Sequence, residues 1–216
     1  MITEGPLTLD VSAGVALEAS LALPVGATAG VVICHPHPLY GGDMDNPRVL
    51  DVMDACHHAG LGTLRFNFRG TGRSTGRHDD GRGERDDVRA ALAALRERLP
   101  ATGAVALAGY SFGAAVAVAV AASGEALGGL ALLAPPLVAG AYRSGGTLTA
   151  VSGPVLVVAG TMDEYCPVSA LEELRAQWPK AEVRIIEGAD HFFAGRGAPL
   201  IEALRAWAAA VPPGRA

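Results

Sequence analysis

A Gly-x-Ser-x-Gly pentapeptide contains the residue whose type and setting most clearly suggest chemistry. Ser111 lies at the centre of Gly109–Gly113, directly after one apolar run and before another. A nucleophilic serine at a sharp strand-to-helix turn has a strained backbone, and flanking glycines leave room for such a turn. The N-terminus of the following helix also favours negative charge beside the serine. The pentapeptide therefore predicts a nucleophile; a glycine-rich packing turn is the alternative.

A histidine and an aspartate later in the chain could supply the base that a serine hydroxyl needs. His191 follows the last predicted strand, and Asp163 follows the strand before it. The chain order Ser111, Asp163, His191 is the order that this type of serine turn predicts. Asp190 and Glu164 are neighbours that compete for the acidic role, but Asp163 stands closest to its strand end. We therefore predict a Ser-His-Asp triad.

Two backbone N–H groups must also point at the negative charge that develops on a substrate oxygen. Phe112, the residue after the nucleophile, is expected to supply one. The second is expected from the loop at residues 35–42, where the prolines have no N–H to offer. His37 is the preferred donor there, with Leu39 and Tyr40 as alternatives.

The elements that must position these residues alternate between short apolar strands and amphipathic helices. Repeated alternation of this kind predicts a mostly parallel, doubly wound α/β sheet with helices on both faces. The carboxyl ends of such strands meet at one edge, where ligands bind. Strands are predicted at residues 8–11, 15–23, 30–34, 61–68, 105–108, 130–133, 155–159 and 183–186. Helices are predicted at residues 47–59, 84–99, 112–122, 169–178 and 200–211.

Composition excludes several other classes of protein. The 216 residues are 50% apolar and 18% charged, which is too apolar for a disordered chain. A net charge of −5 gives no basic footprint for nucleic acid. Three cysteines are too few for a disulfide scaffold and suggest buried, inert thiols. No segment has the composition of a linker, so residues 1–216 are expected to form a single α/β domain.

Two features could suggest a membrane or an exported protein, and we interpret both otherwise. Residues 104–124 carry no charge and reach the length of a membrane span. Their two halves differ in pattern, so we expect a buried strand followed by a buried helix and no membrane partner. The N-terminus has no basic segment followed by an apolar run, so the expected location is cytoplasmic.

Three weaker signals suggest other ligands. His35 and His37 have the H-x-H spacing of a metal site, but no third ligand follows closely, so no metal is expected; a structural role is expected for His35. The glycines within residues 70–76 do not have the spacing of a nucleotide fingerprint and are expected to form a tight turn beside the site. Arg69 and Arg73 could contact an acidic group of a substrate; the alternative, which we expect, is that both are solvated arginines at the surface.

The chain resembles the α/β-hydrolase superfamily, and it is similar to small lidless members near the dienelactone-hydrolase-like and carboxylesterase groups. Dienelactone hydrolases proper use a cysteine nucleophile, so Ser111 favours ordinary ester hydrolysis. Only about twenty residues separate the predicted strands at 130–133 and 155–159, and the site is therefore expected to be open. The resemblance rests on the His35–Pro38 segment with Gly41-Gly42, the Arg65–Gly70 segment leading to Gly72, Ser74 and Gly76, the Gly109–Gly113 turn, Asp163 and His191.

These residues together predict a serine hydrolase that cleaves small or medium carboxylic esters without a cofactor. The alternatives are a thioesterase or an amide or peptide hydrolase with the same triad, and a non-catalytic binding protein of the same fold. The expected partner is a small-molecule ester. Aromatic residues are candidate pocket walls, each with a core role as the alternative: Tyr40, Tyr110, Tyr142, Phe192 and Phe193.

Overall fold

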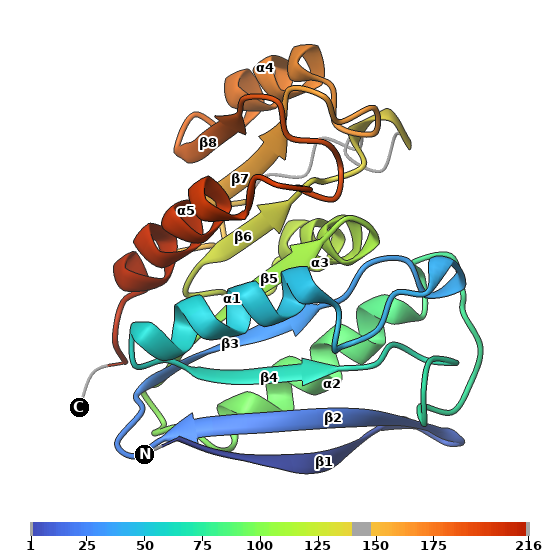
Figure 1. Ribbon diagram of the computed structural model, residues 1–216. Coiled ribbons are helices and arrows are strands. Elements are labelled where there is room, and N and C mark those ends of the chain that lie inside the picture. Colours follow the sequence, from blue (N-terminus) through green and yellow to red (C-terminus); the bar gives the residue numbers. More distant parts are fainter. Residues whose placement is uncertain (1, 140–147, 215–216) are drawn as a thin grey trace.

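An eight-stranded sheet forms the centre of the computed structural model, which describes residues 2–139 and 148–214 (Figure 1). Its order is β1-β2-β4-β3-β5-β6-β7-β8. The strands from β4 across to β8 are parallel, whereas β2 pairs antiparallel with both β1 and β4. The bounds are β1 Ile2–Ser12, β2 Val15–Pro24, β3 Ala29–Cys34, β4 Gly62–Phe66, β5 Ala104–Tyr110, β6 Leu130–Leu133, β7 Val155–Gly160 and β8 Ala181–Ile186.

Helices cover both faces of this sheet, as the alternation of patterns predicts. The helices α1 and α5 pack on one face, and α2, α3 and α4 pack on the other (Figure 1). Each face has its own apolar core, so the central strands are buried on both sides. The bounds are α1 Pro47–His58, α2 Glu84–Arg96, α3 Phe112–Ala122, α4 Val168–Gln177 and α5 Gly197–Ala210, with short 3-10 turns η1 Pro38–Tyr40 and η2 Leu137–Ala139.

The uncharged stretch at residues 104–124 is β5 followed by α3, as predicted. Every residue of β5 after Ala104 is buried, and most of α3 is buried as well. A strand and a helix enclosed by protein need no polar face, which explains their continuous apolar sequence. In the described part of the chain, no helix combines the length and the apolar character that crossing a membrane would require.

Predicted element boundaries differ from the structure at several ends. The sheet pairing of β1 extends back to Ile2, opposite Pro24, well before the predicted start at residue 8. The strand β4 ends at Phe66, because the N–H of Phe68 donates to the His35 ring instead of to a neighbouring strand. The helix α2 ends at Arg96, where the following turn tightens before Pro100. These contacts arise between distant segments or within the last helical turn, and the periodicity of the sequence does not encode them.

Candidate active site

The turn between β5 and α3 holds Ser111 in a strained conformation. Its φ is 52° and its ψ is −116°, a region that non-glycine residues rarely adopt. A Cβ at Gly109 would lie 2.4 Å from the Gly113 carbonyl oxygen, and a Cβ at Gly113 would lie 2.4 Å from the Cys34 carbonyl oxygen. Both positions therefore require glycine, because a larger residue would push α3 away from β3 and β5. This geometry is the one that the pentapeptide predicts.

The structure brings Ser111, His191 and Asp163 into one hydrogen-bonded chain. Nε2 of His191 lies 2.9 Å from the Ser111 hydroxyl, and Nδ1 lies 2.9 and 3.0 Å from the two carboxylate oxygens of Asp163. A carboxylate can only accept, so Nδ1–H is the donor to Asp163. This leaves Nε2 of the neutral ring as the acceptor for the serine proton. The arrangement is therefore able to remove a proton from Ser111.

The Asp163 carboxylate is held rigidly at the end of β7. Its side chain is fully buried, and Oδ1 also accepts from the N–H groups of Tyr165 and Cys166. Asp190 instead accepts from the N–H groups of two residues in its own turn, and Glu164 is exposed. Of the three acidic candidates, the structure brings only Asp163 to the histidine.

The segment that carries His191 is fixed by Tyr110, the residue before the nucleophile. The buried Tyr110 hydroxyl donates to the His191 carbonyl oxygen at 3.1 Å, and burial raises the pKa of Tyr110 to about 12. Tyr165 also packs against the imidazole, with ring centroids 4.8 Å apart. The serine turn and the histidine turn are thus tied together directly, which limits the movement of the ring relative to the nucleophile.

Both expected oxyanion donors line the cavity beside Ser111. Across residues 2–139 and 148–214, neither the Phe112 N–H nor the His37 N–H donates to a protein acceptor. The first N–H groups of a helix have no partner within the helix, so Phe112 is free for this reason. Partial burial, with a smaller effect of His78, lowers the pKa of the His37 ring. Two unpaired N–H groups can therefore face a substrate oxygen.

The ring of His35 serves the fold, as expected from its position. Nδ1 lies 2.6 Å from the Pro36 carbonyl oxygen, and Nε2 accepts from the Phe68 N–H at 3.0 Å. Burial lowers the pKa of His35 to about 4. Both nitrogens are therefore occupied, and the H-x-H pair does not present two free ligands. Within the described ranges, no group of three or more His, Cys, Asp or Glu side chains is arranged to hold a metal ion.

A cavity of about 580 Å³ opens at Ser111. Three of the aromatic candidates, Tyr40, Tyr110 and Phe192, line it. Phe193 is buried in the core, and Tyr142 lies outside the described residues. Sequence reasoning missed further lining residues. An entirely apolar α3 gives no sign of which of its faces is open, and the other residues come from separate loops and helices that only the fold brings together. The missed residues are Asn46, Asp80, Gly81, Arg85, Ala115, Val116, Ala119, Pro136 and Tyr165.

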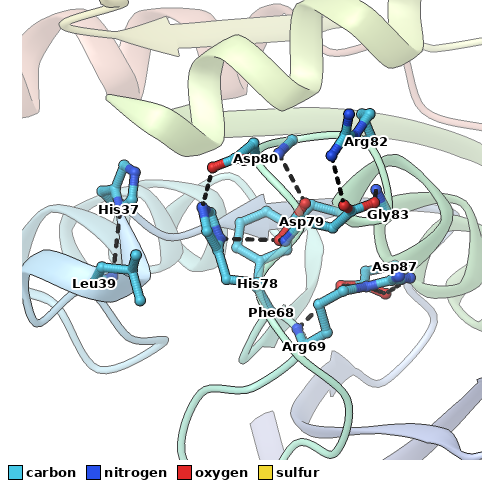
Figure 2. Close-up of polar contacts among 12 residues, drawn as sticks. His37, Leu39, Phe68, Arg69, His78, Asp79, Asp80, Arg82, Gly83 and Asp87 are labelled. Carbon is cyan, nitrogen blue, oxygen red and sulfur yellow. Dashed lines mark hydrogen bonds and ion pairs between the residues drawn. The ribbon is translucent and has the colours of Figure 1, made fainter.

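The two arginines considered as substrate contacts are engaged elsewhere. Arg69 forms an ion pair of 2.7 Å with the fully buried Asp87, so it is not a solvated surface residue (Figure 2). Arg73 pairs with Glu18 at 2.8 Å. The glycine turn at residues 70–76 lines a neighbouring cavity and does not line the one that holds Ser111. The three cysteines are buried and unpaired, and burial raises the pKa of each thiol.

Comparison with known proteins agrees with this arrangement. A family model described as an alpha/beta hydrolase domain matches residues 28–211. The chain belongs to this family. An alpha-beta serine hydrolase homologue from Coxiella burnetii is 36% identical, with a TM-score of 0.83 over 94% of this chain and 96% of that chain. An α/β serine hydrolase without a lid from Xanthomonas campestris is 30% identical, with a TM-score of 0.83 over 99% and 97% of the two chains.

A sequence relative of this chain is found in a further organism. An uncharacterized protein of Rickettsia prowazekii is 31% identical over 168 residues, which are 75% of this chain and 71% of that protein. The predicted resemblance to small lidless α/β hydrolases is confirmed, and so is the doubly wound fold. Membership of this α/β-hydrolase group supports hydrolase activity; it does not specify the bond that is cleaved.

Proposed function

We propose that this α/β hydrolase is a serine hydrolase of small or medium carboxylic esters, with Ser111, His191 and Asp163 as its catalytic residues. The observation that carries the proposal is the continuous chain of contacts from the Ser111 hydroxyl through His191 to the buried Asp163 carboxylate. Nucleophile, base and orienting acid within hydrogen-bond distance are the requirements for acyl transfer to a serine.

In the first half of the proposed reaction, His191 Nε2 takes the Ser111 proton as Oγ attacks the ester carbonyl carbon. The carbonyl oxygen becomes an oxyanion that accepts from the N–H groups of Phe112 and His37. Asp163 stabilises the imidazolium that forms. When the C–O bond to the alcohol breaks, His191 returns the proton to the departing oxygen, which leaves an acyl group on Ser111.

In the second half, water replaces the alcohol. His191 removes a proton from water, which attacks the acyl carbon, and the same two N–H groups stabilise the second oxyanion. Collapse of this intermediate transfers the proton from His191 to Ser111 Oγ and releases the carboxylic acid. Each step uses only the side chains and backbone of this chain, together with water.

Removal of the nucleophile tests the proposal. The variant Ser111→Ala should lower kcat for short p-nitrophenyl esters by about 10⁵- to 10⁶-fold, as expected when a triad nucleophile is lost. Ser123→Ala makes the same substitution at the exposed end of α3 and should retain activity. Turnover that survives in folded Ser111→Ala would contradict the mechanism.

The nature of the bond needs a separate comparison. The same triad serves esters, thioesters and amides. Matched substrates with one acyl group and three leaving groups, an alcohol, a thiol and an amine, should give the highest kcat/KM for the ester. A clear preference for the thioester or the amide would keep the triad and correct the substrate class.

A further inference from the structure

The cavity at Ser111 continues as an apolar trough along α3. Phe112, Ala115, Val116 and Ala119 line it, so it reaches eight residues beyond the nucleophile, or about 12 Å along a helix. A Cβ at Gly81, which also lines the cavity, would lie 3.7 Å from the Phe112 ring and 3.8 Å from Val116. Gly81 therefore lies close to Phe112 and Val116 and borders the trough beside these two side chains. A trough of this shape suits a linear hydrocarbon chain.

Arg85, in the first turn of α2, also lines this cavity. Its Nε donates to the Gly81 carbonyl oxygen at 3.0 Å, which places the guanidinium beside Gly81 at the border of the trough. In the ranges 2–139 and 148–214, no carboxylate lies within 4 Å of this guanidinium. Its terminal NH₂ groups are therefore available to a ligand.

Three arginines near Arg85 differ from it in this respect. Arg69 pairs with Asp87, Arg82 with Asp79, and Arg89 with Asp86 (Figure 2 shows the first two pairs). A cation in the first turn of a helix also opposes the helix dipole. Neither an ion pair nor the stability of α2 therefore accounts for Arg85 at this position.

Asp80 also lines the cavity, and its carboxylate lies beside His78. Its Oδ1 lies 3.4 Å from Nε2 of His78 (Figure 2). Nδ1 of the same ring lies 3.0 Å from the buried Glu84 carboxylate, so His78 stands between two acidic groups. The Asp80–His78 contact is thus a close approach without hydrogen-bond geometry, whereas no carboxylate of the described residues lies within 4 Å of the Arg85 guanidinium.

The sheet order indicates which part of an ester would meet Arg85. Ser111 follows β5, whereas His191 follows β8, on the far side of β6 and β7. The helix α2 that carries Arg85 packs against β1, β3, β4 and β5, on the opposite side of the serine. His191 must protonate the departing alcohol, so the alcohol lies on its side. The acyl chain then extends along α3 toward Arg85.

We propose that Arg85 makes the far end of the α3 trough a subsite for a carboxylate, so that the protein prefers esters whose acyl chain ends in one. Such substrates are half-esters of medium-length dicarboxylic acids. The hydrocarbon portion lies on Ala115 and Ala119, and the terminal carboxylate accepts hydrogen bonds from the Arg85 guanidinium. This inference rests on the proposed ester hydrolysis at Ser111 and names its substrate class.

The test compares the mono-p-nitrophenyl ester of suberic acid with the same compound methylated at its free carboxylate. The readout is the ratio of kcat/KM for the anionic substrate to that for the capped one, which cancels any general loss of activity in a variant. The wild-type ratio should exceed one. Arg85→Gln should lower it about five-fold, the effect expected of one partly exposed ion pair, and Arg85→Glu should lower it further.

Arg89→Gln is the matched control, because it removes the same charge one turn along α2 from a residue that does not line the cavity. It should leave the ratio at the wild-type value. If the ratio of kcat/KM fell equally in Arg89→Gln and Arg85→Gln, the net charge of the protein would explain the effect, and the inference would be overturned. A wild-type ratio of one or less, with the capped ester still hydrolysed, would overturn it and leave the proposed function intact. Failure to hydrolyse either ester would overturn both.

Discussion

The buried ring of His35 should make the stability of the fold depend on pH in a defined window. Its Nε2 accepts from the Phe68 N–H, so a proton on this nitrogen would remove the bond that joins β3 to the segment after β4. Burial lowers the pKa of the folded state from 6.5 to about 4. In the unfolded chain His35 therefore takes up a proton near pH 6.5, whereas in the folded chain it takes up the proton only near pH 4.

The sign and size of the effect follow from this difference. The contribution of His35 to the free energy of unfolding is fully present above pH 6.5. It falls as the pH is lowered toward 4, because the unfolded state binds more protons across that interval. The change in pKa corresponds to about 3 kcal/mol in the free energy of unfolding. Below about pH 4 both states are protonated, and this contribution no longer changes with pH.

Urea unfolding of the wild type and of His35→Gln between pH 7.5 and pH 4 would measure this contribution. Glutamine Oε1 can accept from the Phe68 N–H but takes up no proton in this range. The other titrating groups are common to both proteins and cancel in the difference. The stability advantage of the wild type should therefore shrink by about 3 kcal/mol as the pH falls. An advantage that does not change with pH would refute the account of His35.

Two further predictions concern packing around the site. Gly113→Ala adds a Cβ 2.4 Å from a carbonyl oxygen of β3 and should lower the free energy of unfolding by about 1–3 kcal/mol; Gly197→Ala, which meets no atom within 4 Å, is the control, and equal stabilities in urea unfolding would contradict the prediction. Asp87→Asn leaves the Arg69 guanidinium without its buried partner and should cost about 3–5 kcal/mol by the same assay. Asp79→Asn removes a surface pair and should change little, so similar losses in the two variants would count against the buried pair.

The sequence predicts much of the fold because its signals are local. The predicted ranges for α3 and β6 agree with the structure, because α3 follows a glycine turn and β6 is bounded by glycines and prolines. Ser111, Asp163 and His191 follow strands in the order that the serine turn predicts, and the structure brings their side chains together. Residue type and spacing were sufficient to select them from a chain with six histidines.

The walls of the cavity could not be predicted in the same way. Ala115 and Ala119 stand on a helix with no polar face, so the sequence does not say that these two positions are open to the cavity. The sequence does not distinguish Arg85 from the other arginines of a charged segment. Its lack of an acidic partner becomes clear only when the ion pairs of its neighbours are known. The buried Arg69–Asp87 pair likewise depends on how α2 packs beneath the loop after β4, which no local pattern describes.

Covalent labelling by a fluorophosphonate tests the central proposal most directly, because the probe reacts with an activated serine and needs no knowledge of the substrate. Peptide mapping by mass spectrometry should find the adduct on Ser111 in the wild type and in Ser123→Ala. It should be absent from Ser111→Ala. A folded wild-type protein that stays unlabelled, or an adduct on a different residue, would contradict the assignment of Ser111 as a nucleophile activated by His191 and Asp163.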